Sequence, residues 1–143
     1  MNKVPLIVTN DDRGTISNGK MFPGAGSQLQ AIIAGTNLRK GSSHSSTSLE
    51  EPGTFDLVGK PNPFAMNLIK EQHGLDPNSR TIMIGDRPNT DIVFGKVAGV
   101  DTCLVLTGVV LSKEDFEDNW QNENQDYEPT YIMHMVGDRN ATL

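Results

Sequence analysis

The sequence is poor in cysteine, in basic residues and in long apolar runs, and each shortage argues against a class of protein. Cys103 is the single cysteine among 143 residues, so it cannot form an internal disulfide, and its apolar neighbours favour a small buried side chain in an intracellular protein. Twelve basic residues stand against eighteen acidic ones, and the net charge of -6 argues against nucleic acid or an anionic membrane as a partner. No run approaches the roughly 18 apolar residues of a membrane helix, and the first residues do not resemble a signal peptide. We therefore expect a soluble, cytoplasmic protein.

Apolar residues make up only 36% of the chain, and much of this shortage lies in two polar stretches. Residues 37–54 are rich in serine and predict a surface insertion loop, in which His44 is expected to be solvated. Residues 112–129 contain seven acidic residues from Glu114 onward and predict an exposed connection, with a short helix around Phe116 and Trp120. The segments outside these stretches have the apolar content of an ordinary domain.

The first part of the chain predicts a short strand over residues 4–9, a polar turn, and a helix over residues 28–34. The glycine-rich segment at residues 23–27 precedes this helix. A phosphate-binding loop is the alternative interpretation of these glycines, but no Gly-Lys-Ser/Thr follows them. The sequence favours a turn into a helix.

Strands and helices alternate in the rest of the chain. Strands are predicted at residues 55–58, 81–84 and 102–107, with helices at residues 64–73 and 91–98 between them. This order predicts a βαβαβ unit with parallel strands and right-handed crossovers. The helix over residues 64–73 should bury Phe64, Leu68 and Ile69 and end at Gly74, and residues 131–136 predict a last edge strand.

Two turns that follow predicted strands carry the candidate chemistry. Asp86 and Asp91 flank a proline turn after residues 81–84, at the edge of the sheet where open α/β folds place their sites. Two carboxylates suit Mg²⁺, which takes one or two of them and keeps several waters. Lys60 lies in a Gly-Lys-Pro turn after residues 55–58. A plain surface ion pair is the alternative role for Lys60 and Asp86.

Together these motifs resemble the haloacid dehalogenase-like (HAD) phosphatases, whose third motif is a lysine and whose fourth is Gly-Asp followed by a further Asp. The segments at residues 58–64, 84–92 and 104–109 resemble the branch of 4-nitrophenylphosphatase and phosphoglycolate or pyridoxal phosphatase. Residues 9–12 resemble its Thr-Asn-x-Asp motif, and residues 22–27 its Pro-Gly-x-Gly motif before a helix. The resemblance covers nearly the whole chain except the Ser-rich loop.

The resemblance implies an α/β fold: the C-terminal half of a three-layer Rossmann-like core, with a parallel sheet and flanking helices, plus the tail of the cap domain. The cap tail would span residues 1–36, the Ser-rich insertion residues 37–54, and the half-core residues 55–143 with the acidic connection at 112–129. It also implies Mg²⁺-dependent hydrolysis of a small phosphorylated metabolite through an aspartyl-phosphate intermediate. Lys60 would hold the nucleophile and the phosphate, Asp86 would bind Mg²⁺, and Asp91 would orient a metal-bound water or the loop. Residues expected to adjust this site or to contact the substrate are Asn10, Asp12, Asn62 and Arg87.

The nucleophile motif of the family, Asp-x-Asp-Gly-Thr/Val, is missing from these 143 residues. Residues 11–15 imitate it, but Arg13 stands where the family has its acidic general acid/base, and the Thr-Asn-x-Asp alignment explains the same residues without that defect. We therefore expect the chain alone to be inactive. A non-catalytic binding or regulatory protein that pairs with another chain, either the missing N-terminal half or a second copy, is the alternative.

Overall fold

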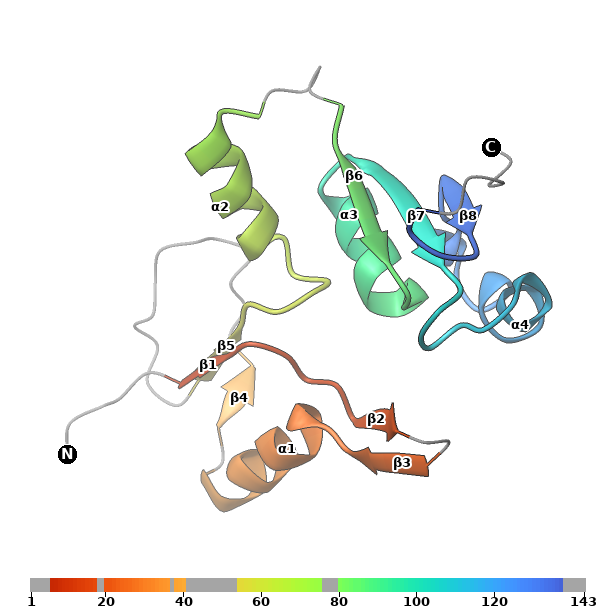
Figure 1. The fold of residues 1–143 in the computed structure, drawn as a ribbon. Helices are drawn as coiled ribbons and strands as arrows, with labels where there is room; N and C mark the ends of the chain where they lie inside the picture. Colours follow the sequence, from red (N-terminus) through yellow and green to blue (C-terminus); the bar gives the residue numbers. More distant parts are fainter. Residues whose placement is uncertain (1–5, 18–19, 37, 41–53, 76–79, 138–143) are drawn as a thin grey trace. The chain divides into compact units, whose positions relative to one another are not determined.

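Two three-stranded parallel sheets organise the chain in the computed structural model (Figure 1). The structure describes residues 6–17, 20–36, 38–40, 54–75 and 80–137, and these form two compact units, Met1–Ala65 and Met66–Leu143. Most of the predicted Ser-rich loop, including His44, lies outside the described residues. The mixed α/β fold with parallel sheets and flanking helices confirms the predicted fold class.

The sheet of the first unit has the order β1-β5-β4, formed by Leu6–Val8, Thr54–Leu57 and Arg39–Lys40. All pairs are parallel, and Val8 lies opposite Leu57. The helix α1, Ala25–Thr36, packs Leu29 against this sheet, in a core of Val8, Leu29, Phe55 and Leu57. The helix begins directly after Gly24, so the glycine-rich segment is a turn into a helix as predicted.

A hairpin of β2, Gly14–Ser17, and β3, Lys20–Pro23, precedes α1 and was not predicted. Every residue of β3 is exposed, so the segment lacks the alternation of apolar and polar residues that marks a half-buried strand. The hairpin instead follows from antiparallel backbone pairing, with Gly14 opposite Pro23.

The sheet of the second unit has the order β6-β7-β8, formed by Ile82–Gly85, Asp101–Val105 and Tyr131–Met133. The pairs are parallel, and β8 is an edge strand of this sheet as predicted, although it ends at Met133 and the prediction extended it to residue 136. A π-helical turn η1, Pro88–Ile92, continues into α3, Val93–Val97, between β6 and β7. Cys103 on β7 is fully buried, and burial raises the pKa of its thiol, as fits a structural side chain.

The predicted strand at residues 55–58 is β5, and it belongs to the sheet of the first unit. β5 pairs with β1 and β4, whereas β6 pairs with β7, so the prediction of one βαβαβ unit from Phe55 to Thr107 is wrong. The alternation of strands and helices along the sequence does not determine which strands pair with one another. The βαβ part from β6 to β7 is correct.

The helix α2 spans Phe64–His73, as predicted, and Gly74 ends it with a positive φ of 62°. Its predicted buried stripe is wrong. Phe64, Leu68 and Ile69 are 42%, 43% and 41% exposed, and Met66 is the buried residue of this helix. The C-terminal turn of α2 is fixed by Lys70, whose Nζ donates to the carbonyl of Ala98 at 2.5 Å.

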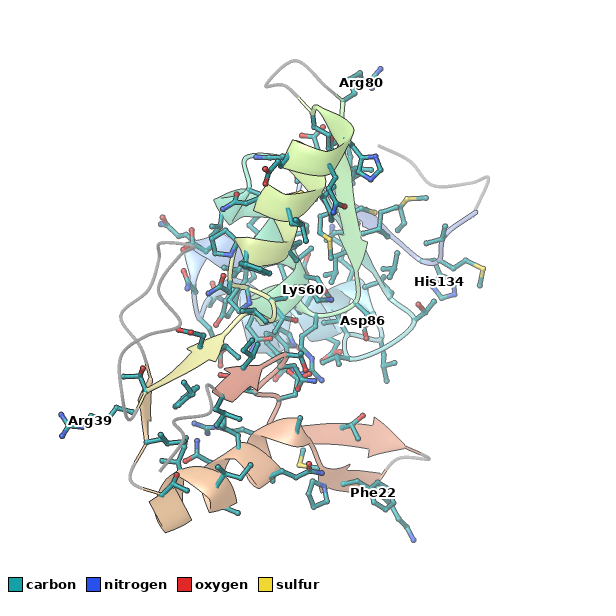
Figure 2. The ribbon with its side chains drawn as sticks, turned by 90° about the vertical axis from the view of Figure 1, so that its left-hand side faces the viewer. Phe22, Arg39, Lys60, Arg80, Asp86 and His134 are labelled. Atoms are coloured by element: carbon teal, nitrogen blue, oxygen red, sulfur yellow. The ribbon has the colours of Figure 1, made fainter. Side chains whose placement is uncertain are left out.

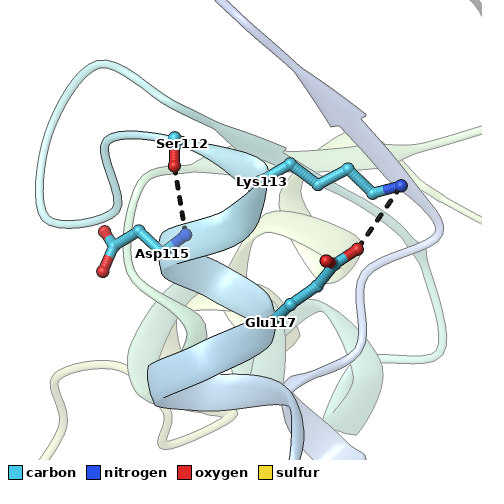
Figure 3. Close-up of polar contacts among 4 residues, drawn as sticks. All are labelled: Ser112, Lys113, Asp115 and Glu117. Carbon is cyan, nitrogen blue, oxygen red and sulfur yellow. Dashed lines mark hydrogen bonds and ion pairs between the residues drawn. The ribbon is translucent and has the colours of Figure 1, made fainter.

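The acidic stretch is mostly exposed and contains a short helix around Phe116 and Trp120, as predicted. It forms α4, Lys113–Phe116, then the helical turns η2, Glu117–Gln121, and η3, Gln125–Tyr127. Ser112 caps α4 by accepting the amide of Asp115 at 3.1 Å, and Lys113 pairs with Glu117 at 3.5 Å (Figure 3). Phe116 is 2% exposed and packs with Ile92, Leu104 and Val110, so the acidic charge sits on the solvent side of a helix that completes the core.

Within the part of the chain that the structure describes, no helix combines the length and apolarity needed to cross a membrane.

Candidate functional site

Asp86 follows β6 and receives a hydrogen bond from the loop after the neighbouring strand β7. The amide of Val109 donates to Oδ2 of Asp86 at 2.8 Å. A Cβ built at Gly108 would lie 2.5 Å from Cγ and 2.7 Å from Cβ of Asp86. Asp86 is half-buried, and Figure 2 labels it at the end of its strand. The carboxylate is therefore held at the carboxyl edge of the β6-β7-β8 sheet by two consecutive residues of one loop.

Asp91 stabilises the turn that begins at Asp86 through hydrogen bonds. Its side chain is buried, with 4% of the residue exposed, and its Oδ2 accepts the amide of Arg87 at 3.1 Å. The amide of Asp91 in turn donates to the carbonyl of Arg87 at 2.9 Å. Pro88, which is fully buried, opens η1 between these two residues. Asp91 is thus hydrogen-bonded within the loop that follows β6.

The donor set of the turn from Gly85 to Asp91, the Asp86 corner, fits part of a magnesium site. Asp86 offers a hard carboxylate oxygen at a sheet edge, and Mg²⁺ is usually held by one or two protein carboxylates, waters and substrate phosphate. No cluster of three or more His, Cys, Asp or Glu that could hold a metal occurs among the described residues. The corner therefore supplies a partial coordination shell rather than a closed cage.

Lys60 lies in the first unit, at the turn between β5 and α2, and its side chain is exposed (Figure 2). The peptide bond between Lys60 and Pro61 is cis. The amide of Asn62 donates to the carbonyl of Gly59 at 2.9 Å, and Oδ1 of Asn62 accepts the amide of Phe64 at 2.9 Å. Asn62 therefore shapes the turn that carries Lys60 and connects it to the start of α2.

The turn that contains Asn10 and Asp12 packs against the Lys60 turn within the first unit. Oδ1 of Asn10 accepts the amide of Asp12 at 3.1 Å. A Cβ at Gly59 would overlap the carbonyl oxygen of Thr9 and lie 3.0 Å from the Cα of Asn10. The two turns are thus in backbone contact, which only a glycine at position 59 permits.

Gly24, just before α1, and Gly26, in its first turn, contact the other side of the Asn10 turn. The amide of Gly26 donates to the carbonyl of Asp12 at 2.8 Å, and the amide of Gly24 to that of Arg13 at 3.0 Å. A Cβ at Gly26 would overlap the carbonyl oxygen of Asp11. The Pro-Gly-x-Gly segment therefore serves as a support for the turn at residues 10–12.

The predicted site residues thus form two groups, each described within its own unit. The Lys60 group brings Lys60 and Asn62 next to the turn of Asn10 and Asp12, and the Asp86 group brings together Asp86, Arg87 and Asp91. Sequence reasoning missed the contact of Gly108 and Val109 with Asp86. A glycine shortly after a buried strand, beside a strand that is followed by an aspartate, is the signal that indicates such a close approach.

Comparisons with known proteins agree on one family. A family model described as HAD-hydrolase-like matches residues 57–138. Phosphoglycolate phosphatase 2 of Arabidopsis thaliana is 35% identical over 134 residues, which are 93% of this chain and 38% of that protein. The structure of 4-nitrophenylphosphatase from Thermotoga maritima aligns with a TM-score of 0.66 at 33% identity, over 92% of this chain and 42% of the other.

A glycerol phosphate phosphatase from Mycobacterium tuberculosis, solved in complex with calcium, aligns with a TM-score of 0.64 at 26% identity, over 91% of this chain and 32% of the other. These names confirm the predicted resemblance to the 4-nitrophenylphosphatase and phosphoglycolate phosphatase branch. The chain spans about two fifths of the length of the Arabidopsis and Thermotoga proteins.

Proposed function

Because this chain belongs to the HAD-hydrolase-like family, we propose that it supplies the lysine and metal-binding part of a small-molecule phosphate monoester phosphatase. The observation that carries the proposal is the Asp86 corner: a carboxylate fixed by the Val109 amide at the edge of a parallel sheet. The phosphatase relatives support the reaction class, and the substrates in their names differ from one another. The substrate class is therefore a small phosphorylated metabolite.

Each site residue has a role in this proposal. Lys60 offsets the negative charge of the phosphoryl group and of the attacking carboxylate, and Asn62 sets the turn from which Lys60 projects. Asn10 and Asp12, whose turn packs on that of Lys60, contact the non-reacting part of the substrate. Arg87 and Asp91 keep the loop after β6 in place through their mutual hydrogen bonds.

Mg²⁺ is the proposed cofactor, held by Asp86 together with waters and phosphate oxygens. A bound Mg²⁺ would neutralise negative charge on the phosphoryl group. The calcium complex of the mycobacterial relative supports a divalent-cation site in this fold. The nucleophile of the whole reaction is an aspartate that forms an aspartyl-phosphate, and this residue is to be supplied by a segment other than these 143 residues.

The proposal is tested by assaying the 143-residue chain with 4-nitrophenyl phosphate and Mg²⁺. We expect turnover at background, because groups that act as one unit lose most of the rate when one is missing. Asp11→Ala is the matched variant, since residues 11–15 imitate the nucleophile motif. Robust Mg²⁺-dependent turnover that Asp11→Ala abolishes would contradict the proposal and assign the nucleophile to Asp11.

A second candidate function is a non-catalytic half-domain that binds another polypeptide. Among the described strands β6 pairs with β7 alone, and its side chains Ile82 and Ile84 are 45% and 43% exposed. Parallel strands are normally covered on both faces, and a free edge is a template for a further strand. Sedimentation of the purified chain tests this candidate: a concentration-independent monomer excludes pairing with a second copy.

A further inference from the structure

The loop after β7 is held beside Asp86 by contacts on both sides of Gly108. On one side, the amide of Leu106 donates to the carbonyls of Met133 and His134, at 3.0 and 3.2 Å. On the other, Val110 is fully buried in the core with Ile92, Leu104 and Phe116. Gly108 and Val109 lie between these anchors, so their backbone forms a fixed wall beside the carboxylate.

We propose that Gly108 and the amide of Val109 form a seat that selects the orientation of the Asp86 carboxylate, which makes Gly108 a positioning residue for the cation. The Val109 amide donates to Oδ2 at 2.8 Å, so Oδ1 is the carboxylate oxygen that would hold the cation. The proposal rests on the function proposed above, since it presumes that Asp86 binds the metal. Its new content is the requirement for glycine at position 108.

The physical reason is that a methyl group at position 108 occupies the space of the carboxylate itself. A Cβ there would overlap Oδ2 and lie 2.5 Å from Cγ. Gly108 has no positive φ, so its backbone suits alanine, and the three atoms nearest to the added Cβ all belong to the side chain of Asp86. Because Asp86 is half-buried rather than buried, we expect its side chain to rotate to another staggered conformation, which would remove its carboxylate from the seat.

Gly85 offers a contrast within the same corner. A Cβ at Gly85 would overlap the side chain of Asp91, which is only 4% exposed. Gly85→Ala is therefore expected to destabilise the fold, whereas Gly108→Ala is expected to keep the fold and displace one carboxylate. This difference allows positioning to be separated from folding.

The experiment uses the full 143-residue chain and Mn²⁺ as a paramagnetic probe, with NMR line broadening of backbone amides as the readout. The variants are Gly108→Ala and Asp86→Asn, and Gly35→Ala is the control, because a Cβ at Gly35 in α1 meets no atom within 4 Å. Hydrogen exchange of the Val109 amide, without metal, reports the seat directly. Thermal unfolding reports the fold.

We expect Gly108→Ala to unfold within a few degrees of the wild type, to lose protection of the Val109 amide, and to need about 10- to 100-fold more Mn²⁺ for the same broadening at residues 85–87 and 107–109. Asp86→Asn should weaken Mn²⁺ binding similarly, and Gly35→Ala should change neither readout. If Asp86→Asn weakens Mn²⁺ binding and Gly108→Ala does not, the seat is wrong and the proposed function stands. If Asp86→Asn leaves the broadening unchanged, or the wild type shows none at these residues, the metal assignment of Asp86 fails and the seat fails with it.

Discussion

The carboxylate of Asp91 lies against the α-carbon of Gly85, so closely that a methyl group at position 85 would overlap it. Asp91 is at the same time the acceptor for the amide of Arg87, four residues earlier. The buried side chain of Asp91 therefore packs on Gly85 at the end of β6 and accepts a hydrogen bond from Arg87, so it contacts the chain on both sides of Asp86.

Gly85→Ala should destabilise the second unit, because Asp91 is buried and cannot move away without breaking its bond to Arg87. Forced overpacking of this kind costs about 1–3 kcal/mol in free energy of unfolding. Chemical denaturation measures the loss. The matched control is Gly35→Ala in an open part of α1, which should be neutral or stabilising by up to about 1 kcal/mol. Equal effects of the two substitutions would contradict the packing of Asp91 on Gly85.

Asp91→Ala should cost about 1–3 kcal/mol of stability, because it removes the acceptor for the Arg87 amide and leaves a small cavity. Asp91→Asn should cost less, since its amide oxygen can still accept that hydrogen bond. The comparison by urea denaturation separates loop orientation from charge. A loss for Asp91→Asn as large as that for Asp91→Ala would contradict this, because both variants lack the negative charge and the asparagine alone keeps the acceptor.

The sequence was most informative where a pattern is local. The helix at residues 64–73 and its stop at Gly74 follow from composition and a single glycine, and both agree with the structure. The Asp86 turn was also recognisable, because a short apolar strand runs directly into Gly85 and Asp86. These features need no knowledge of distant residues.

Features that depend on distant partners could not be predicted. The apolar run of β5 looks like that of β6, yet the two strands pair in different sheets. Phe116 stands in an acidic stretch but is buried because Ile92 and Leu104 supply an apolar surface for it. The seat for Asp86 was likewise missed, since it joins residues that lie more than twenty positions apart in the chain.

Gly59→Ala should disrupt the contact between the Lys60 turn and the turn of Asn10. The added Cβ would overlap the backbone carbonyl of Thr9, which can yield only if the end of β1 shifts. The amide of Val58 donates to the carbonyl of Val8 at 2.9 Å, next to this contact, so its hydrogen exchange should accelerate. Unchanged protection of the Val58 amide would contradict the close packing of the two turns.

Thr102→Val should destabilise the attachment of the segment before β8. Thr102 is fully buried and exchanges two hydrogen bonds with Thr130: its amide donates to Oγ1 of Thr130 at 3.0 Å, and its own Oγ1 accepts the amide of Thr130 at 2.9 Å. Valine keeps the shape but leaves the Thr130 amide without this acceptor, at a cost of about 1–3 kcal/mol. Thr102→Ser retains the hydroxyl and is the control in the same denaturation series. A valine variant as stable as the serine variant would contradict this role of the Thr102 hydroxyl.

The central claim is that Asp86 is the carboxylate of this chain that binds Mg²⁺, and a Mg²⁺ titration followed by amide chemical shifts tests it most directly. The account predicts weak binding, because the corner holds only part of a coordination shell, with shifts at residues 85–91 and 107–109 that Asp86→Ala removes. Shifts confined to the acidic residues 114–128, or tight binding that survives Asp86→Ala, would contradict it.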